Sequence, residues 1–171
     1  QGQVRWTTYD GVSIPVPPAG HPRLYLRAQD IPDLQRRTTH PVLKPVWEKL
    51  QAAAKNNPAL AVEVDAIRYL LSKDADLGRR TAATALKLLQ DTTFDKSRQD
   101  ITRPIGRLLV TGAMVYDWCY PVLTPDQKTA YLERFLHLAR SLESGYPPPK
   151  SGVVTGHYSE WMLMRDLLSA G

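Results

Sequence analysis

The residues best suited to chemistry lie in one short segment, residues 156–161 (GHYSEW). His157 and Glu160 are three positions apart, so a helix would present them as neighbours on one face. A carboxylate beside an imidazole favours the protonated ring and fixes its orientation. Such a pair can neutralise a substrate carboxylate or move a proton. The same spacing also fits a buried histidine that is hydrogen-bonded to a glutamate and joins a helix to the preceding connector.

Arg103 is a second candidate, because it precedes Pro104 at the start of a predicted helix. A guanidinium there can bind a carboxylate or a sulfate through two hydrogen bonds. A structural ion pair with Asp117 or Asp100 is an equally good interpretation. Cys119 is the one cysteine of the chain and lies among apolar and aromatic residues. We therefore predict a small buried thiol there rather than a nucleophile.

The sequence gives little support for a metal centre. His157 and Glu160 could supply two ligands, but His21, His40 and His137 lie in unrelated contexts. No third ligand follows at a spacing typical of zinc sites. The sequence also lacks a phosphate-binding glycine loop and a Cys-x-x-Cys motif. We expect this chain to bind no metal.

Composition and charge narrow the class of partner. Hydrophobic residues make up 43% of the 171 positions, which is enough for one domain with its own core. No apolar run approaches the ~18 residues of a membrane helix. The formal net charge of +5 suits a polyanionic partner, and it equally suits a merely soluble surface. The basic residues show no nucleic-acid-binding pattern, so we expect no nucleic acid partner.

The first 24 residues are predicted to form an extended arm. Its four prolines fix φ and remove backbone donors, which excludes a helix. The alternation of Val12, Ile14 and Val16 suggests that one face of the arm packs against the body. No signal peptide is visible and the chain begins at Gln1, which we interpret as a leader already removed or as a piece of something longer.

Residues 25–171 are predicted to be all-α, because apolar residues recur there at helical spacing and strand signals are nearly absent. The polar stretch 91–100 reads as a loop, and Gly106 and Gly112 indicate close approach of a neighbouring element or a ligand. Short connections favour antiparallel helical hairpins, as in an α/α toroid or an irregular bundle. Prolines or capping residues mark the expected helix starts, at Pro32, Pro41, Asn57, Asp74 or Asp76, and Thr124.

Several long strings match a known family. They are residues 10–18 (DGVSIPVPP), 21–27 (HPRLYLR), 110–120 (VTGAMVYDWCY), 145–148 (GYPP) and 156–162 (GHYSEWM). On these strings the chain resembles the N-terminal part of heparinase II-type bacterial polysaccharide lyases, the heparinase II/III family. The resemblance covers nearly the whole chain.

The resemblance implies a specific architecture and activity. Residues 25–171 would be the N-terminal portion of an α/α toroid, truncated at its C-terminal end and followed in the full-length family by β-domains. The full-length protein would be a homodimer that is periplasmic or secreted, with its signal peptide removed. It would cleave heparin and heparan sulfate by β-elimination at uronic acids, a reaction that needs the uronate carboxylate neutralised and a proton moved from C5.

Carried over residue by residue, the resemblance places His157 and Glu160 at active-site positions and Arg103 beside the substrate cleft. His157 would neutralise the carboxylate or assist proton transfer, and Glu160 would orient it or bind the sugar. The family's catalytic tyrosine, its second histidine and its structural zinc ligands would lie beyond residue 171. We therefore expect no cofactor in this chain and no activity from it alone.

Three alternatives remain open at this stage. The first is a lyase for another uronate polymer, such as alginate or chondroitin. The second is a non-catalytic helical module that binds acidic glycans. The third is a purely structural helical domain in which His157 is a core residue.

Overall fold

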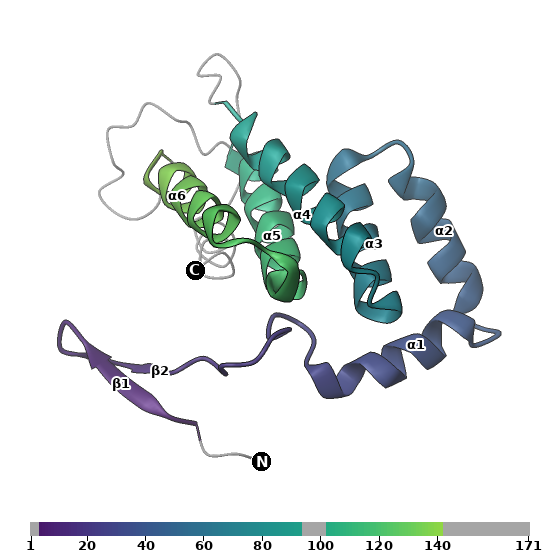
Figure 1. Cartoon of the computed structure of the whole chain (residues 1–171), viewed down its shortest axis with the longest axis horizontal. Helices are drawn as coiled ribbons and strands as arrows, with labels where there is room; N and C mark the ends of the chain where they lie inside the picture. The colour runs from purple at the N-terminus through teal and green to yellow at the C-terminus, as the bar shows by residue number, and fades with distance from the viewer. Residues whose placement is uncertain (1–3, 94–101, 142–171) are drawn as a thin grey trace.

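The computed structural model describes residues 4–93 and 102–141 (Figure 1). These residues form a small N-terminal hairpin and a mostly helical body, so the expected all-α class is confirmed. Within the described ranges the elements are β1 (Trp6–Tyr9), β2 (Val12–Pro15), the 3-10 helix η1 (Ala28–Asp30), α1 (Ile31–Thr39), α2 (Lys44–Ala54), α3 (Pro58–Ser72), α4 (Ala75–Gln90), α5 (Thr102–Trp118), the 3-10 helix η2 (Tyr120–Val122) and α6 (Pro125–Ser141).

Side-chain caps begin the longer helices, as the sequence predicts. Asn57 Oδ1 accepts a hydrogen bond at 3.1 Å from the backbone N–H three residues on. Asp74, rather than Asp76, caps α4, because its carboxylate accepts from two N–H groups of the first turn at 2.9 and 3.1 Å. Thr124 and Gln127 form the predicted reciprocal capping box at 3.2 and 3.0 Å.

The start of α2 differs from the prediction. The helix begins at Lys44 with Pro45 in its first turn, and not at Pro41. The backbone N–H groups of Leu43 and Lys44 both donate to the carbonyl of His40, so a separate turn precedes the helix. Val46, in the first turn of α2, is 62% exposed.

The core lies between α3, α4, α5 and α6. Gly112 of α5 marks the closest approach: a Cβ there would lie 2.7 Å from Leu89 Cδ1 and 3.0 Å from Phe135 Cε1. The expected close approach at this glycine is therefore confirmed, and α4 and α6 supply the neighbours. The buried apolar residues of α4 are Ala82, Ala85, Leu86 and Leu89.

Two hydrogen bonds from α6 to backbone carbonyls of α4 fix the distance between these helices. Tyr131 Oη donates to the carbonyl of Ala82 at 2.7 Å, and Arg134 Nε donates to the carbonyl of Leu89 at 2.6 Å. Arg134 belongs to α6, and its guanidinium lies beside the C-terminal end of α4. Its positive charge therefore also complements the negative end of the α4 dipole. Burial raises the pKa of Tyr131, which keeps its hydroxyl proton available for the bond.

The N-terminal arm is a β-hairpin that projects away from the helices (Figure 1). Asp10 and Gly11 both have positive φ, of 49° and 76°, which is the backbone geometry of a tight hairpin turn. Val12 is 61% and Ile14 41% exposed. The prediction that the alternating apolar residues pack against the body was therefore wrong for Val12 and Ile14, whereas Val16 is half-buried.

The described helices include none that is both long and apolar enough to cross a membrane.

Overpacking at Gly112 should destabilise the fold. Gly112→Val places two methyl groups against Leu89 and Phe135, which are fully or almost fully buried and cannot move aside. We expect a loss of about 1–3 kcal/mol in the free energy of unfolding, measured by urea denaturation followed by circular dichroism. Gly20→Val is the control, because a Cβ at Gly20 meets nothing within 4 Å. Equal effects at the two positions would contradict the assigned packing.

Candidate functional site

Of the three site residues predicted from the sequence, only Arg103 belongs to the part of the chain that the structure describes. His157 and Glu160 lie outside the described residues. Arg103 is the second residue of α5, and its backbone belongs to the first turn of that helix. Asp117 is near the other end of α5, about 20 Å away at ~1.5 Å per residue. An ion pair between Arg103 and Asp117, one of the interpretations above, is therefore excluded.

The partners of Asp117 come instead from the N-terminal arm. His21 Nδ1 lies 2.6 Å from Asp117 Oδ1. The backbone N–H groups of Arg23 and Leu24 donate to Oδ2 at 2.7 and 2.8 Å. The Arg23 guanidinium lies further off, with Nε 3.8 Å from Oδ1. Asp117 is only 2% exposed, so these contacts replace the water that a carboxylate would otherwise bind.

Aromatic contacts extend this cluster. The ring of His21 stacks on Tyr120 with 3.8 Å between centroids and 13° between planes. Lys128 Nζ lies 3.8 Å from the centroid of the same Tyr120 ring. Trp118 Nε1 donates to the carbonyl of Leu24 at 3.0 Å. Residues from the arm, α5, η2 and α6 thus meet at one point.

A histidine–aspartate pair can prepare a ring nitrogen for proton transfer. In this structure the geometry favours an anchoring role instead. One carboxylate oxygen of Asp117 accepts hydrogen bonds from two backbone N–H groups of the arm. The side chain of His21 is only 10% exposed. The stacked Tyr120 covers one face of the imidazole. We conclude that the pair holds the arm on the helical body. Sequence reasoning singled out Asp117 but missed His21, whose position 96 residues away gives no local signal.

A second buried carboxylate, Glu63 of α3, is paired with α5. Arg107 Nη2 donates to both carboxylate oxygens at 2.8 Å, and Thr111 Oγ1 donates to Oε1 at 2.5 Å. Arg107 and Thr111 are four residues apart on α5 and so share one face. A buried charge that is paired and hydrogen-bonded in this way is explained by its role in joining two helices.

Cys119 has the properties of an inert core thiol, as predicted. It is fully buried, and this burial raises the pKa of the thiol from 9.0 to about 12. The reactive form of a cysteine is the thiolate. A nucleophilic role for Cys119 near neutral pH is therefore excluded.

Within residues 4–93 and 102–141, no three or more His, Cys, Asp and Glu side chains are grouped so as to hold a metal ion. No protein-family model matches the chain, and no curated protein sequence matches it significantly. The resemblance to heparinase II-type lyases thus rests on the sequence strings themselves.

Removing the Asp117 carboxylate should release the arm. Asp117→Ala leaves the N–H groups of Arg23 and Leu24 without an acceptor in a buried position, and we expect a loss of about 3–5 kcal/mol. Urea denaturation gives the free energy of unfolding. Asp117→Asn keeps one acceptor oxygen and should lose less. Asp33→Ala is the matched control, since Asp33 also has two side-chain partners but is exposed, and its loss should be far smaller. A loss at Asp117 no larger than that at Asp33 would contradict the anchor.

Alkylation measures the state of Cys119. In the native protein at pH 8 we expect no reaction with iodoacetamide, because the thiol is buried and protonated. In urea the same residue should react fully, as mass spectrometry would show. The raised pKa also predicts that stability falls as the pH rises above about 9, where the unfolded thiol ionises and the folded one does not. Rapid native alkylation would contradict the assigned burial.

Proposed function

We propose that this chain is the N-terminal helical part of a polysaccharide lyase that cleaves heparin or heparan sulfate by β-elimination at uronic acids. The observation that carries the proposal is the string 156–162, in which His157 and Glu160 stand at the spacing of one helical turn. The other matching strings, and the helical pairs that follow an N-terminal arm, agree with the architecture that the resemblance implies.

The contacts of the arm give the proposal further support. Two of the matching strings are residues 21–27 and 110–120, which lie far apart in the sequence. They contact each other through the hydrogen bonds from His21, Arg23 and Leu24 to Asp117. The resemblance therefore includes both halves of one buried contact, which is what a shared fold would require.

The chemistry of the reaction explains the need for an imidazole and a carboxylate. A base removes the proton from C5 of the uronate, the electron pair forms the C4–C5 double bond, and the bond from C4 to the glycosidic oxygen breaks. That oxygen takes up a proton as it leaves. Negative charge develops on the uronate carboxylate during proton removal, so a cation beside it lowers the barrier.

We assign these roles within the proposal as follows. His157, protonated beside Glu160, faces the uronate carboxylate or moves a proton. Glu160 holds the imidazole in place or binds the sugar. Arg103, at the start of α5, binds a carboxylate or sulfate of the polymer through its guanidinium. The net charge of +5 favours approach of an acidic polysaccharide.

The remaining features belong to the full-length protein. The proposal includes a complete α/α toroid, a homodimer, a periplasmic or secreted location, and a structural zinc whose ligands lie outside this chain. A lyase for alginate or chondroitin would use the same reaction at a differently shaped site. A non-catalytic glycan-binding module would use the same positive charge without the reaction.

The function is tested by His157→Ala in the full-length protein. We expect the rate of formation of the unsaturated uronate, followed by its ultraviolet absorbance, to fall by about 10²–10⁴-fold. Heparin, heparan sulfate, chondroitin sulfate and alginate serve as parallel substrates, and the polymer that is cleaved fastest defines the specificity.

His40→Ala is the control for the loss of a histidine, because His40 is exposed and follows α1. Its turnover should equal that of the wild type. Unchanged turnover in a folded His157→Ala variant would remove this residue from the mechanism. Salt-dependent retention on heparin with no product from the wild type would favour the binding module.

A further inference from the structure

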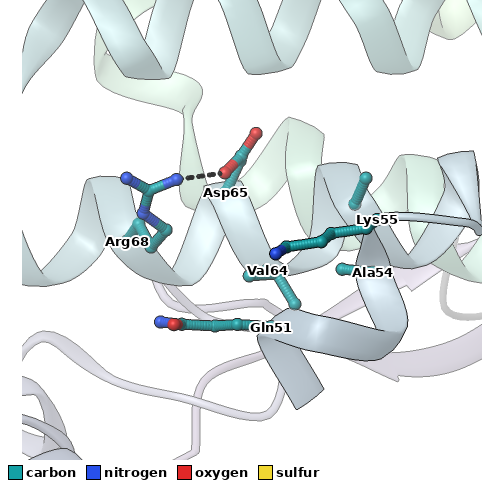
Figure 2. A pocket seen from close by; sticks show the side chains of 7 residues that line it. Gln51, Ala54, Lys55, Val64, Asp65 and Arg68 are labelled. Carbon is teal, nitrogen blue, oxygen red and sulfur yellow. Dashed lines mark hydrogen bonds and ion pairs between the residues drawn. The ribbon is translucent and has the colours of Figure 1, made fainter. Parts of the chain in front are cut away.

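A groove lies between the C-terminal end of α2 and α3 (Figure 2). Its volume of about 390 Å³ falls within the ~300–1,000 Å³ typical of small-molecule sites. The lining is apolar on one part and polar on the other. Ala54 and Val64 supply the apolar part and are almost fully buried, at 7% and 4% exposure.

The polar part of the groove is rich in hydrogen-bond donors. Figure 2 shows Lys55 and Gln51 extending across the groove in the direction of Arg68. Lys55 forms no ion pair within the part of the chain that the structure describes. Arg68 Nη1 donates to Asp65 Oδ1 at 3.0 Å, and the other N–H groups of this guanidinium remain available.

The charges favour an anionic ligand. Two cations, Lys55 and Arg68, face one carboxylate, Asp65, so the groove carries a net positive charge. Lys55 lines the groove and is exposed, so its ammonium group can receive an anionic oxygen. The side-chain amide of Gln51 can exchange hydrogen bonds with hydroxyl groups, and the apolar part can receive C–H groups.

We propose that this groove binds a sugar that carries a carboxylate or sulfate group. The anionic oxygens contact Lys55 and Arg68, a hydroxyl bonds to Gln51, and the ring lies against Ala61 beside the edges of Ala54 and Val64. That the anion is carried by a sugar rests on the proposed function, whereas the preference for an anion rests on the groove alone. The groove is a second, non-catalytic contact for an acidic polymer, and two contacts on one polymer raise its overall affinity.

The test measures binding of small saccharides to the 171-residue chain by isothermal titration calorimetry. The probes are a sulfated uronate disaccharide, an unsulfated uronate disaccharide, a neutral disaccharide and inorganic sulfate. We expect the anionic disaccharides to bind, the neutral one to bind at least about tenfold more weakly, and binding to weaken with salt. The tighter of the two anionic disaccharides identifies the anion.

A double variant that removes both positive charges of the groove tests whether binding takes place there. Lys55→Gln with Arg68→Gln should weaken binding by about tenfold or more, because charge-assisted hydrogen bonds are lost. The matched control is Arg79→Gln with Lys87→Gln, which removes the same charge from α4. Arg79 pairs with Asp76 three residues earlier, as Arg68 does with Asp65. The control should bind as the wild type does, and thermal melts confirm that both variants fold.

Three results would overturn the inference. The first is equal binding by the wild type and the groove variant. The second is an equal loss in the control variant, which would assign binding to overall charge. The third is inorganic sulfate binding as tightly as the disaccharides, which would show that the groove recognises the anion and not the sugar. His157→Ala separates the two proposals: binding that depends on the groove and not on His157 upholds the groove even where no unsaturated product forms.

Discussion

The buried carboxylate of Asp117 is the contact on which the arrangement of arm and helices depends. It accepts three hydrogen bonds from the arm and is only 2% exposed. Without those partners its removal from water would cost several kcal/mol, so the burial of this carboxylate depends on residues 21–24 being in place. The segment between the hairpin and α1 is therefore held in place by one side chain near the end of α5, Asp117.

The same helix has further contacts between Arg107 and Gly112. Glu63 of α3 is bound by Arg107 and Thr111, and α4 and α6 close around Gly112. A helix held by charge pairs and by a glycine contact has little freedom to rotate or slide. In the proposed lyase this matters for Arg103, because a residue in the first turn of a fixed helix can bind a polymer at a defined position.

Local signals in the sequence predicted much of the fold, and contacts between distant segments could not be predicted. Asn57, Asp74 and Thr124 cap their helices because a capping hydrogen bond involves only neighbouring residues. The pairing of His21 with Asp117 spans 96 positions and has no local signature. The hairpin was missed because the prolines of the arm were used only to exclude a helix, and the Asp10-Gly11 pair was not considered as a turn. The expected site at 156–161 came from spacing and resemblance alone, and it lies outside the described residues.

The proposed function requires that the bond to C4 of the uronate is broken by elimination and not by hydrolysis. Digestion of heparan sulfate by the full-length protein in heavy-oxygen water tests this most directly, with mass spectrometry of the products. Elimination consumes no water, so the account predicts an unsaturated uronate end and no more heavy oxygen than the reducing ends of the same products take up from water without the enzyme. Incorporation of heavy oxygen at the cleaved bond, with no unsaturated end, would contradict it.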